Sequence, residues 1–143
     1  PVVFDSNYKF EFGKGIIAEE GKDVTVISTG VMLFKALEAH KLLASDGISA
    51  EIIHMPSIKP IDAKMILESA GKTRNVITIE EHSIIGGLGS AVCEVLAENL
   101  PARVKRIGMT DRFAESGEPE ALFKKYGLTG NNIASEAKKL LNR

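Results

Sequence analysis

Short apolar runs alternate with longer amphipathic stretches along most of the chain. The runs at 24–29, 50–55, 76–79 and 104–107 are rich in valine and isoleucine, which is typical of strands buried in a parallel sheet. The stretches that follow them carry apolar residues at helical spacing. This repeated alternation predicts an α/β fold: an open three-layer sandwich whose mostly parallel sheet has helices on both faces.

Capping and breaking residues place the ends of the helices. The predicted helices are 31–45, 63–70, one that opens at Ser90, 119–126, and a last one that runs through Leu141. Asp62 is a good N-cap for the second helix, and Gly71 is expected to end it. Asn131 or Asn132 is expected to cap the last. In the first helix the polar residues form one stripe: Lys35, Glu38, Lys41 and Ser45.

The N-terminal region adds an edge strand and an arm. Residues 15–18 read as a short strand, and so short a connection to 24–29 allows only an antiparallel pair. The sheet is therefore expected to have about five strands, one of them an antiparallel edge strand. Residues 1–12 alternate aromatic and polar side chains without a helical period. They predict an extended arm whose aromatic rings rest either on a neighbouring surface or on their own domain.

Composition narrows the classes of function. The 143 residues suit one domain, and 44% of them are hydrophobic, enough for a core. A net charge of -1 gives no electrostatic reason to bind nucleic acid or an anionic membrane, and no apolar run approaches the ~20 residues that cross a bilayer. The single cysteine, Cys93, can form no disulfide within the chain, which favours a reducing cytoplasm.

Candidate chemistry gathers after the third predicted strand. Glu80, Glu81 and His82 follow this strand, and then come Gly86, Gly87, Leu88 and Gly89 before the helix that opens at Ser90. A strand end facing a helix N-terminus is where α/β sheets bind ligands.

Two interpretations of the glycine turn stay open. It begins like the dinucleotide fingerprint, with Val92 where the third glycine belongs and Asp111 at about the right distance to contact a ribose. Alternatively, the glycines allow a tight turn and close packing of the helix on the sheet. In that case Glu80 or Glu81 is expected to accept hydrogen bonds from a helix N-terminus.

Other polar residues complete the candidate site. His54 ends the second parallel strand, so it lies on the same sheet edge as His82, and the two are expected to face one crevice. Arg112, in a polar loop, is suited either to a phosphate or to a neighbouring carboxylate. The three histidines lack metal-ligand spacing, and no nucleophile has an evident base, so no catalytic or metal-binding residue is assigned.

These residues also carry a family resemblance. The stretch 80–92, EEHSIIGGLGSAV, resembles the central motif of the C-terminal domain of transketolases, and 23–30, 55–62 and 108–117 resemble further segments of that domain. The domain also occurs in 1-deoxyxylulose-5-phosphate synthase and in 2-oxo-acid dehydrogenase β-subunits. The late loop resembles transketolase more than these cousins, and 80–91 most resembles transketolases made of two polypeptides.

The resemblance implies an activity that this chain does not hold alone. The family transfers a two-carbon ketol unit between sugar phosphates with thiamine diphosphate and Mg, held by two other domains through a Gly-Asp-Gly motif that is absent here. Residues 13–143 would then be a non-catalytic assembly domain, and 1–12 the linker from a missing upstream domain. The upstream pyrimidine- and diphosphate-binding domains and a second copy are the implied partners.

A regulatory module for a small anion or nucleotide is the alternative function. The residues expected at a ligand site or an interface are His54, Glu81, His82, Gly86, Gly87, Gly89, Ser90 and Arg112.

Overall fold

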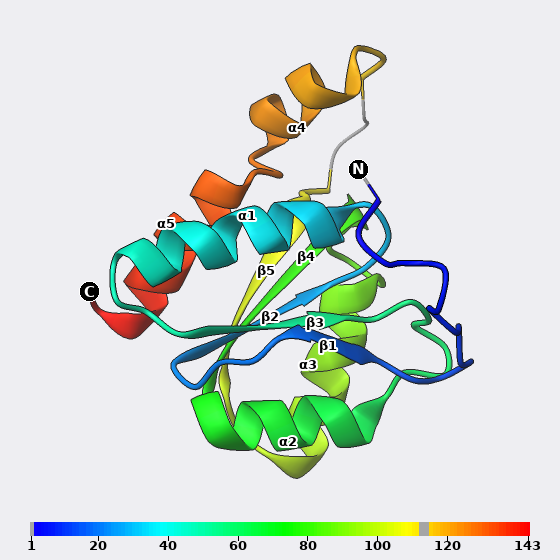
Figure 1. Ribbon diagram of the computed structural model, residues 1–143, viewed down its shortest axis with the longest axis vertical. Coiled ribbons are helices and arrows are strands. Elements are labelled where there is room, and N and C mark those ends of the chain that lie inside the picture. The colour runs from blue at the N-terminus through cyan, green and yellow to red at the C-terminus, as the bar shows by residue number, and fades with distance from the viewer. Residues whose placement is uncertain (1, 112–114) are drawn as a thin grey trace.

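The computed structural model describes residues 2–111 and 115–143 and confirms the predicted α/β architecture (Figure 1). The elements are β1 (Ile16–Glu19), β2 (Val24–Ser28), α1 (Met32–Ser45), β3 (Ala50–His54), α2 (Ala63–Thr73), β4 (Asn75–Ser83), α3 (Leu88–Asn99), β5 (Arg103–Met109), α4 (Pro119–Tyr126) and α5 (Gly130–Leu141). The strand order across the sheet is β1-β3-β2-β4-β5, and every pair except β1 with β3 is parallel.

Helices cover both faces of the sheet, as Figure 1 shows, with α1 and α5 on one side and α2 and α3 on the other. Each face has its own core. On the α1 side Val26, Ile52 and Ile77 pack among buried helix residues, whereas Ile27 and Ile53 face α2 and α3. This alternation follows from the strand geometry, in which successive side chains point to opposite faces. Among the described residues, no helix is long and apolar enough to span a bilayer.

The edge strand β1 is antiparallel, as predicted, but its partner differs from the expected one. It pairs with β3, with Ile16 opposite His54, and not with β2. Both sides of β2 are already taken by β3 and β4, which leaves the outer side of β3 free. Gly21 lies against the backbone of Ala50 so closely that a Cβ would overlap it, and this lets the chain cross the start of β3.

Three helix ends differ from the predictions. Helix α2 continues through Gly71 to Thr73 and ends at Arg74, whose φ of 59° is left-handed. A helical glycine is merely costly, so a well-packed helix passes through it. Helix α5 is capped by Thr129, whose Oγ1 accepts from the Asn132 amide at 3.2 Å, and not by Asn131 or Asn132. Helix α3 begins at Leu88, two residues before Ser90.

Strand β4 is longer than the predicted 76–79 and runs to Ser83, because β5 pairs with it as far as Met109. The group Glu80, Glu81 and His82 therefore belongs to this strand, in the part where its pairing with β5 is irregular, between Ile79 and Ser83.

Candidate functional site

The β4–α3 junction is organised by a buried carboxylate. Glu80 is 1% exposed, and its Oε1 and Oε2 accept hydrogen bonds from the Leu88 amide at 2.9 Å and the Gly89 amide at 2.7 Å. These are first-turn amides of α3, which have no intrahelical partner. A negative charge at this position also compensates the positive end of the helix dipole. The prediction that Glu80 or Glu81 caps a helix is confirmed, and the residue is Glu80.

The glycines of this junction make room for that carboxylate. A Cβ on Gly87 would overlap Glu80 Oε1, and one on Gly89 would lie 2.7 Å from Thr78 Oγ1. Gly108 on the neighbouring β5 is also confined, since its Cβ would lie 3.0 Å from Glu80 Cγ. Among these glycines, Gly86 alone has a left-handed backbone conformation, with φ of 78°, which favours glycine although the space around it is open. The packing interpretation of the glycine turn therefore fits the geometry.

Side chains from α3 and β5 hold the rest of the loop. Ser90 Oγ donates to the Ile84 carbonyl at 2.9 Å and accepts from the Gly86 amide at 2.9 Å. Arg106 Nη1 donates to the same carbonyl at 2.6 Å. The Ile84 amide donates to the Met109 carbonyl at 3.0 Å. The Gly86, Leu88 and Gly89 amides of this turn, which a nucleotide phosphate would contact, are thus engaged within the chain.

Glu81 and His82 lie on the exposed end of β4. The His82 side chain is 68% exposed. Its Nδ1 atom lies 3.0 Å from the carbonyl oxygen of Ser83 and 3.9 Å from Glu80 Oε1. A carbonyl only accepts, so Nδ1 carries the proton in this contact. Both carboxylate oxygens of Glu80 accept hydrogen bonds from α3, and its distance from His82 is too long for a further hydrogen bond.

His54 lies apart from this loop. It ends β3, is 8% exposed, and has its ring centroid 5.7 Å from that of Phe4 in the N-terminal arm. Burial lowers the pKa of His54 below its ordinary 6.5. It lines a cavity of about 430 Å³ together with the start of α1, whereas Gly86, Gly87 and Ser90 line a different groove of about 640 Å³. The two spaces share no lining residue, and His82 lines neither.

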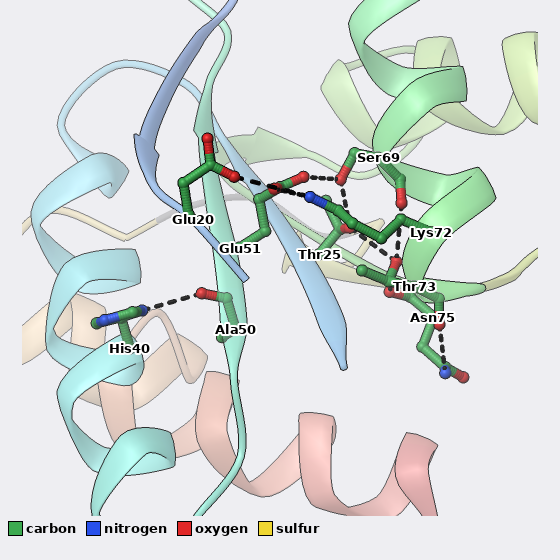
Figure 2. Close-up of polar contacts among 9 residues, drawn as sticks. All are labelled: Glu20, Thr25, His40, Ala50, Glu51, Ser69, Lys72, Thr73 and Asn75. Atoms are coloured by element: carbon green, nitrogen blue, oxygen red, sulfur yellow. Dashed lines mark hydrogen bonds and ion pairs between the residues drawn. The ribbon is translucent and has the colours of Figure 1, made fainter. Parts of the chain in front are cut away.

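A second polar cluster, which the sequence did not reveal, lies at the amino ends of β2 and β3 (Figure 2). Glu51 on β3 is 1% exposed and accepts hydrogen bonds from Ser69 and Lys72 of α2. Thr25 Oγ1 lies 2.6 Å from Ser69 Oγ and 2.8 Å from Thr73 Oγ1. The hydroxyl groups are buried and bonded to one another, so this cluster fastens α2 to the sheet and offers no accessible nucleophile.

The charge of Glu51 is retained in spite of its burial. Desolvation alone would raise the pKa of this carboxyl, but hydrogen bonds from Lys72 and Ser69 and the charge of Lys72 outweigh it and lower the pKa. Lys72 itself is 41% exposed and lies 3.8 Å from Glu20 as well. The ion pair therefore sits at the boundary between core and solvent, which reduces the desolvation cost of its cation.

The remaining candidate, Arg112, lies outside the described residues, so its predicted role stays a prediction. Within the described ranges, histidine, cysteine and acidic side chains form no group of three that could hold a metal ion.

Comparisons with known proteins agree with this architecture. The family model for the transketolase C-terminal domain matches residues 13–133. A putative transketolase C-terminal section from Methanocaldococcus jannaschii is 50% identical over 126 residues, covering 87% of this chain and 39% of that protein. A 6-deoxy-6-sulfo-D-fructose transketolase subunit from a Clostridium strain is 43% identical over 141 residues, covering 99% of this chain and 44% of that protein.

Relatives with another reaction are similar too. A 1-deoxy-D-xylulose-5-phosphate synthase from Heliobacterium modesticaldum is 38% identical over 129 residues, covering 90% of this chain and 20% of that enzyme.

A solved structure described as a split gene transketolase in an inactive beta4 tetramer superposes with a TM-score of 0.95 at 49% identity, covering 99% of this chain and 46% of that one. The chain spans less than half the length of these relatives. Its sequence and its fold together make it a member of the transketolase C-terminal domain family.

Proposed function

We propose that this chain is the non-catalytic C-terminal domain of a transketolase, which transfers a two-carbon ketol unit between sugar phosphates, and that its role is assembly. The main support is the β4–α3 junction, because the Glu80 carboxylate already accepts the hydrogen bonds of the helix amides to which a ligand would bind. A motif that is satisfied within the chain supports a rigid scaffold, and family membership supplies the class of reaction.

The cofactor belongs to other parts of the enzyme under this proposal. The described residues do not fit thiamine diphosphate with Mg: they gather no metal-ligand group, and Glu80 fills the α3 terminus that would suit a diphosphate. The upstream pyrimidine- and diphosphate-binding domains would hold the cofactor, so no step of ketol transfer is assigned to a residue of this chain.

The N-terminal arm is proposed as the linker from the upstream domain, with the folded domain at 13–143. Phe4 stacks on Tyr8 at 4.5 Å and packs near His54, so part of the arm rests on its own domain. Phe10 and Phe12 are 57% and 70% exposed, which supports a role for them against a neighbouring surface. The proposed enzyme is a homo-oligomer, and the single free cysteine favours the cytoplasm as its location.

Reconstitution tests the assembly role. The upstream polypeptide is assayed for ketol transfer with thiamine diphosphate and Mg, with and without this chain. Activity should appear only when the chain is added. Lys64→Ala, at a side chain 80% exposed, should activate as the wild type does, whereas Gly87→Val, which overlaps Glu80, should not. Full activity without the chain would refute the assembly role.

Two other functions predict different results. A 1-deoxyxylulose-5-phosphate synthase or a 2-oxo-acid dehydrogenase would yield its own product, and no ketol transfer, in the reconstituted mixture. A regulatory module would show nucleotide-dependent NMR shifts at the amides of Gly86, Leu88 and Gly89. We expect no such shifts, because these amides already have partners at 2.9, 2.9 and 2.7 Å.

A further inference from the structure

The β4–α3 loop presents an exposed isoleucine on a rigid support. Ile85 is 60% exposed, although both of its neighbours are held by the hydrogen bonds of Ser90 and Arg106 described above. The Ile85 amide itself donates to Ser83 Oγ at 3.2 Å. Because these hydrogen bonds already fix the backbone of the loop, little backbone entropy remains to be lost when a partner buries the Ile85 side chain.

The residues that follow this isoleucine in the chain line a groove. It has a volume of about 640 Å³, and its lining includes Gly86, which follows Ile85 in the chain, together with Gly87 and Ser90. Ile58, Pro60 and Ile61 lie along one wall, and Ala91 and Val95 of α3 lie along the other. An exposed apolar side chain therefore directly precedes, in the chain, a groove that is lined by both apolar and polar residues.

The two walls of the groove carry opposite charges. Lys59 belongs to the loop wall, and Glu94 and Glu98 belong to the α3 wall. All three are exposed, and none takes part in a salt bridge recorded among residues 2–111 and 115–143.

Two-fold symmetry uses such a surface efficiently. In a two-fold dimer the same patch is presented by both copies, so a residue on one wall meets the opposite wall of the partner copy. Ile85 of each copy would then enter the groove of the other, and each Lys59 would face the acidic α3 wall. We infer that this surface, defined by Ile85, Lys59, Glu94 and Glu98, joins two copies of this chain. The inference rests on the assembly role proposed above and names the surface that performs it.

Sedimentation of the full chain over a range of concentrations tests this inference. The wild type should form dimers or larger assemblies. Ile85→Asp should weaken self-association at least tenfold, which corresponds to about 1.4 kcal/mol. Leu42→Asp is the matched control, because Leu42 is 39% exposed on α1, on the opposite face of the sheet, and should leave the association unchanged. Circular dichroism confirms that each variant is folded.

Charge reversal tests the pairing of the walls. Lys59→Glu and Glu94→Lys should each weaken association, and the double variant should restore it. An association unaffected by Ile85→Asp, or not restored in the double variant, would overturn the inference. A wild-type chain that stays monomeric while still activating the upstream polypeptide would also overturn it, yet would leave the proposed function intact. Loss of binding to that polypeptide in Ile85→Asp, with a monomeric wild type, would assign the groove to the upstream domain instead.

Discussion

Replacing Glu80 with glutamine removes the charge of the α3 cap while keeping the size of the side chain. The carboxylate accepts two amide hydrogen bonds, at 2.9 and 2.7 Å, and is 1% exposed. The amide oxygen of glutamine can keep one of these bonds, but its NH2 group would face the other backbone N–H. One charge-assisted bond, worth about 1.5–3 kcal/mol, is then lost, and the loss of the charge from the helix dipole adds roughly 0.3–1 kcal/mol.

We therefore expect Glu80→Gln to lower the free energy of unfolding by about 2–4 kcal/mol. Urea denaturation at neutral pH, followed by circular dichroism, measures this change. Hydrogen exchange adds a local readout, since the Leu88 and Gly89 amides should lose protection. Glu68→Gln, at an exposed carboxylate on α2, should stay within about 0.5 kcal/mol of the wild type. If Glu80→Gln were as stable as that control, the carboxylate would not be what holds α3.

Three further predictions concern the same fold. Gly87→Ala should cost about 1–3 kcal/mol by overlap with Glu80, measured by urea denaturation. Lys72→Met should cost about 1–3 kcal/mol at pH 7, with solvent access at Lys72 moderating the loss. Because the pKa of Glu51 is lowered in the folded protein, the wild-type ion pair stabilises the fold fully above pH 4.5, the ordinary pKa of the carboxyl. This stabilisation is lost as the pH falls through the lower folded-state pKa. Without Lys72, burial raises that pKa, so acidification from pH 7 to 5 should narrow the difference from wild type. The lowered pKa of His54 predicts that wild-type stability falls as pH drops below 6.5, and His54→Gln should flatten that decline in denaturation curves taken across this range.

The strands and the helix cap were predictable because their signals are local. Buried parallel strands read as continuous apolar runs, and a carboxylate after a strand, followed by glycines and a helix, has few other uses. The sequence left the identity of the capping residue open between Glu80 and Glu81. Strand β4 continues beyond Ile79, and Glu80 is buried against α3, whereas Glu81 is exposed.

Long-range contacts decided what the sequence left hidden. Lys35 belongs to the polar stripe of α1, yet it is 6% exposed, because α4 brings Glu120 to within 3.1 Å of its ammonium from 85 residues away. The ring of Phe34 lies 4.5 Å from the same group. Glu51 likewise reads as an ordinary polar residue in a strand until Ser69 and Lys72 of α2 are placed against it. Whether a charged side chain is buried depends on partners distant in the sequence, and the hydrophobic periodicity of a segment does not predict those partners.

The way the glycine motif is used bears on how one domain serves different enzymes. Relatives at 38–50% identity are named for transketolase and for 1-deoxyxylulose-5-phosphate synthase, two different reactions. In this chain Glu80, Ser90 and Arg106 are all bonded to the backbone of their own domain. The hydrogen bonds recorded for these groups hold their own domain together, and none of them is of a kind that would distinguish one sugar phosphate from another. Under the assembly role proposed above, this domain contributes the surface it presents, and substrate selection belongs to the parts of the enzyme proposed to hold the cofactor.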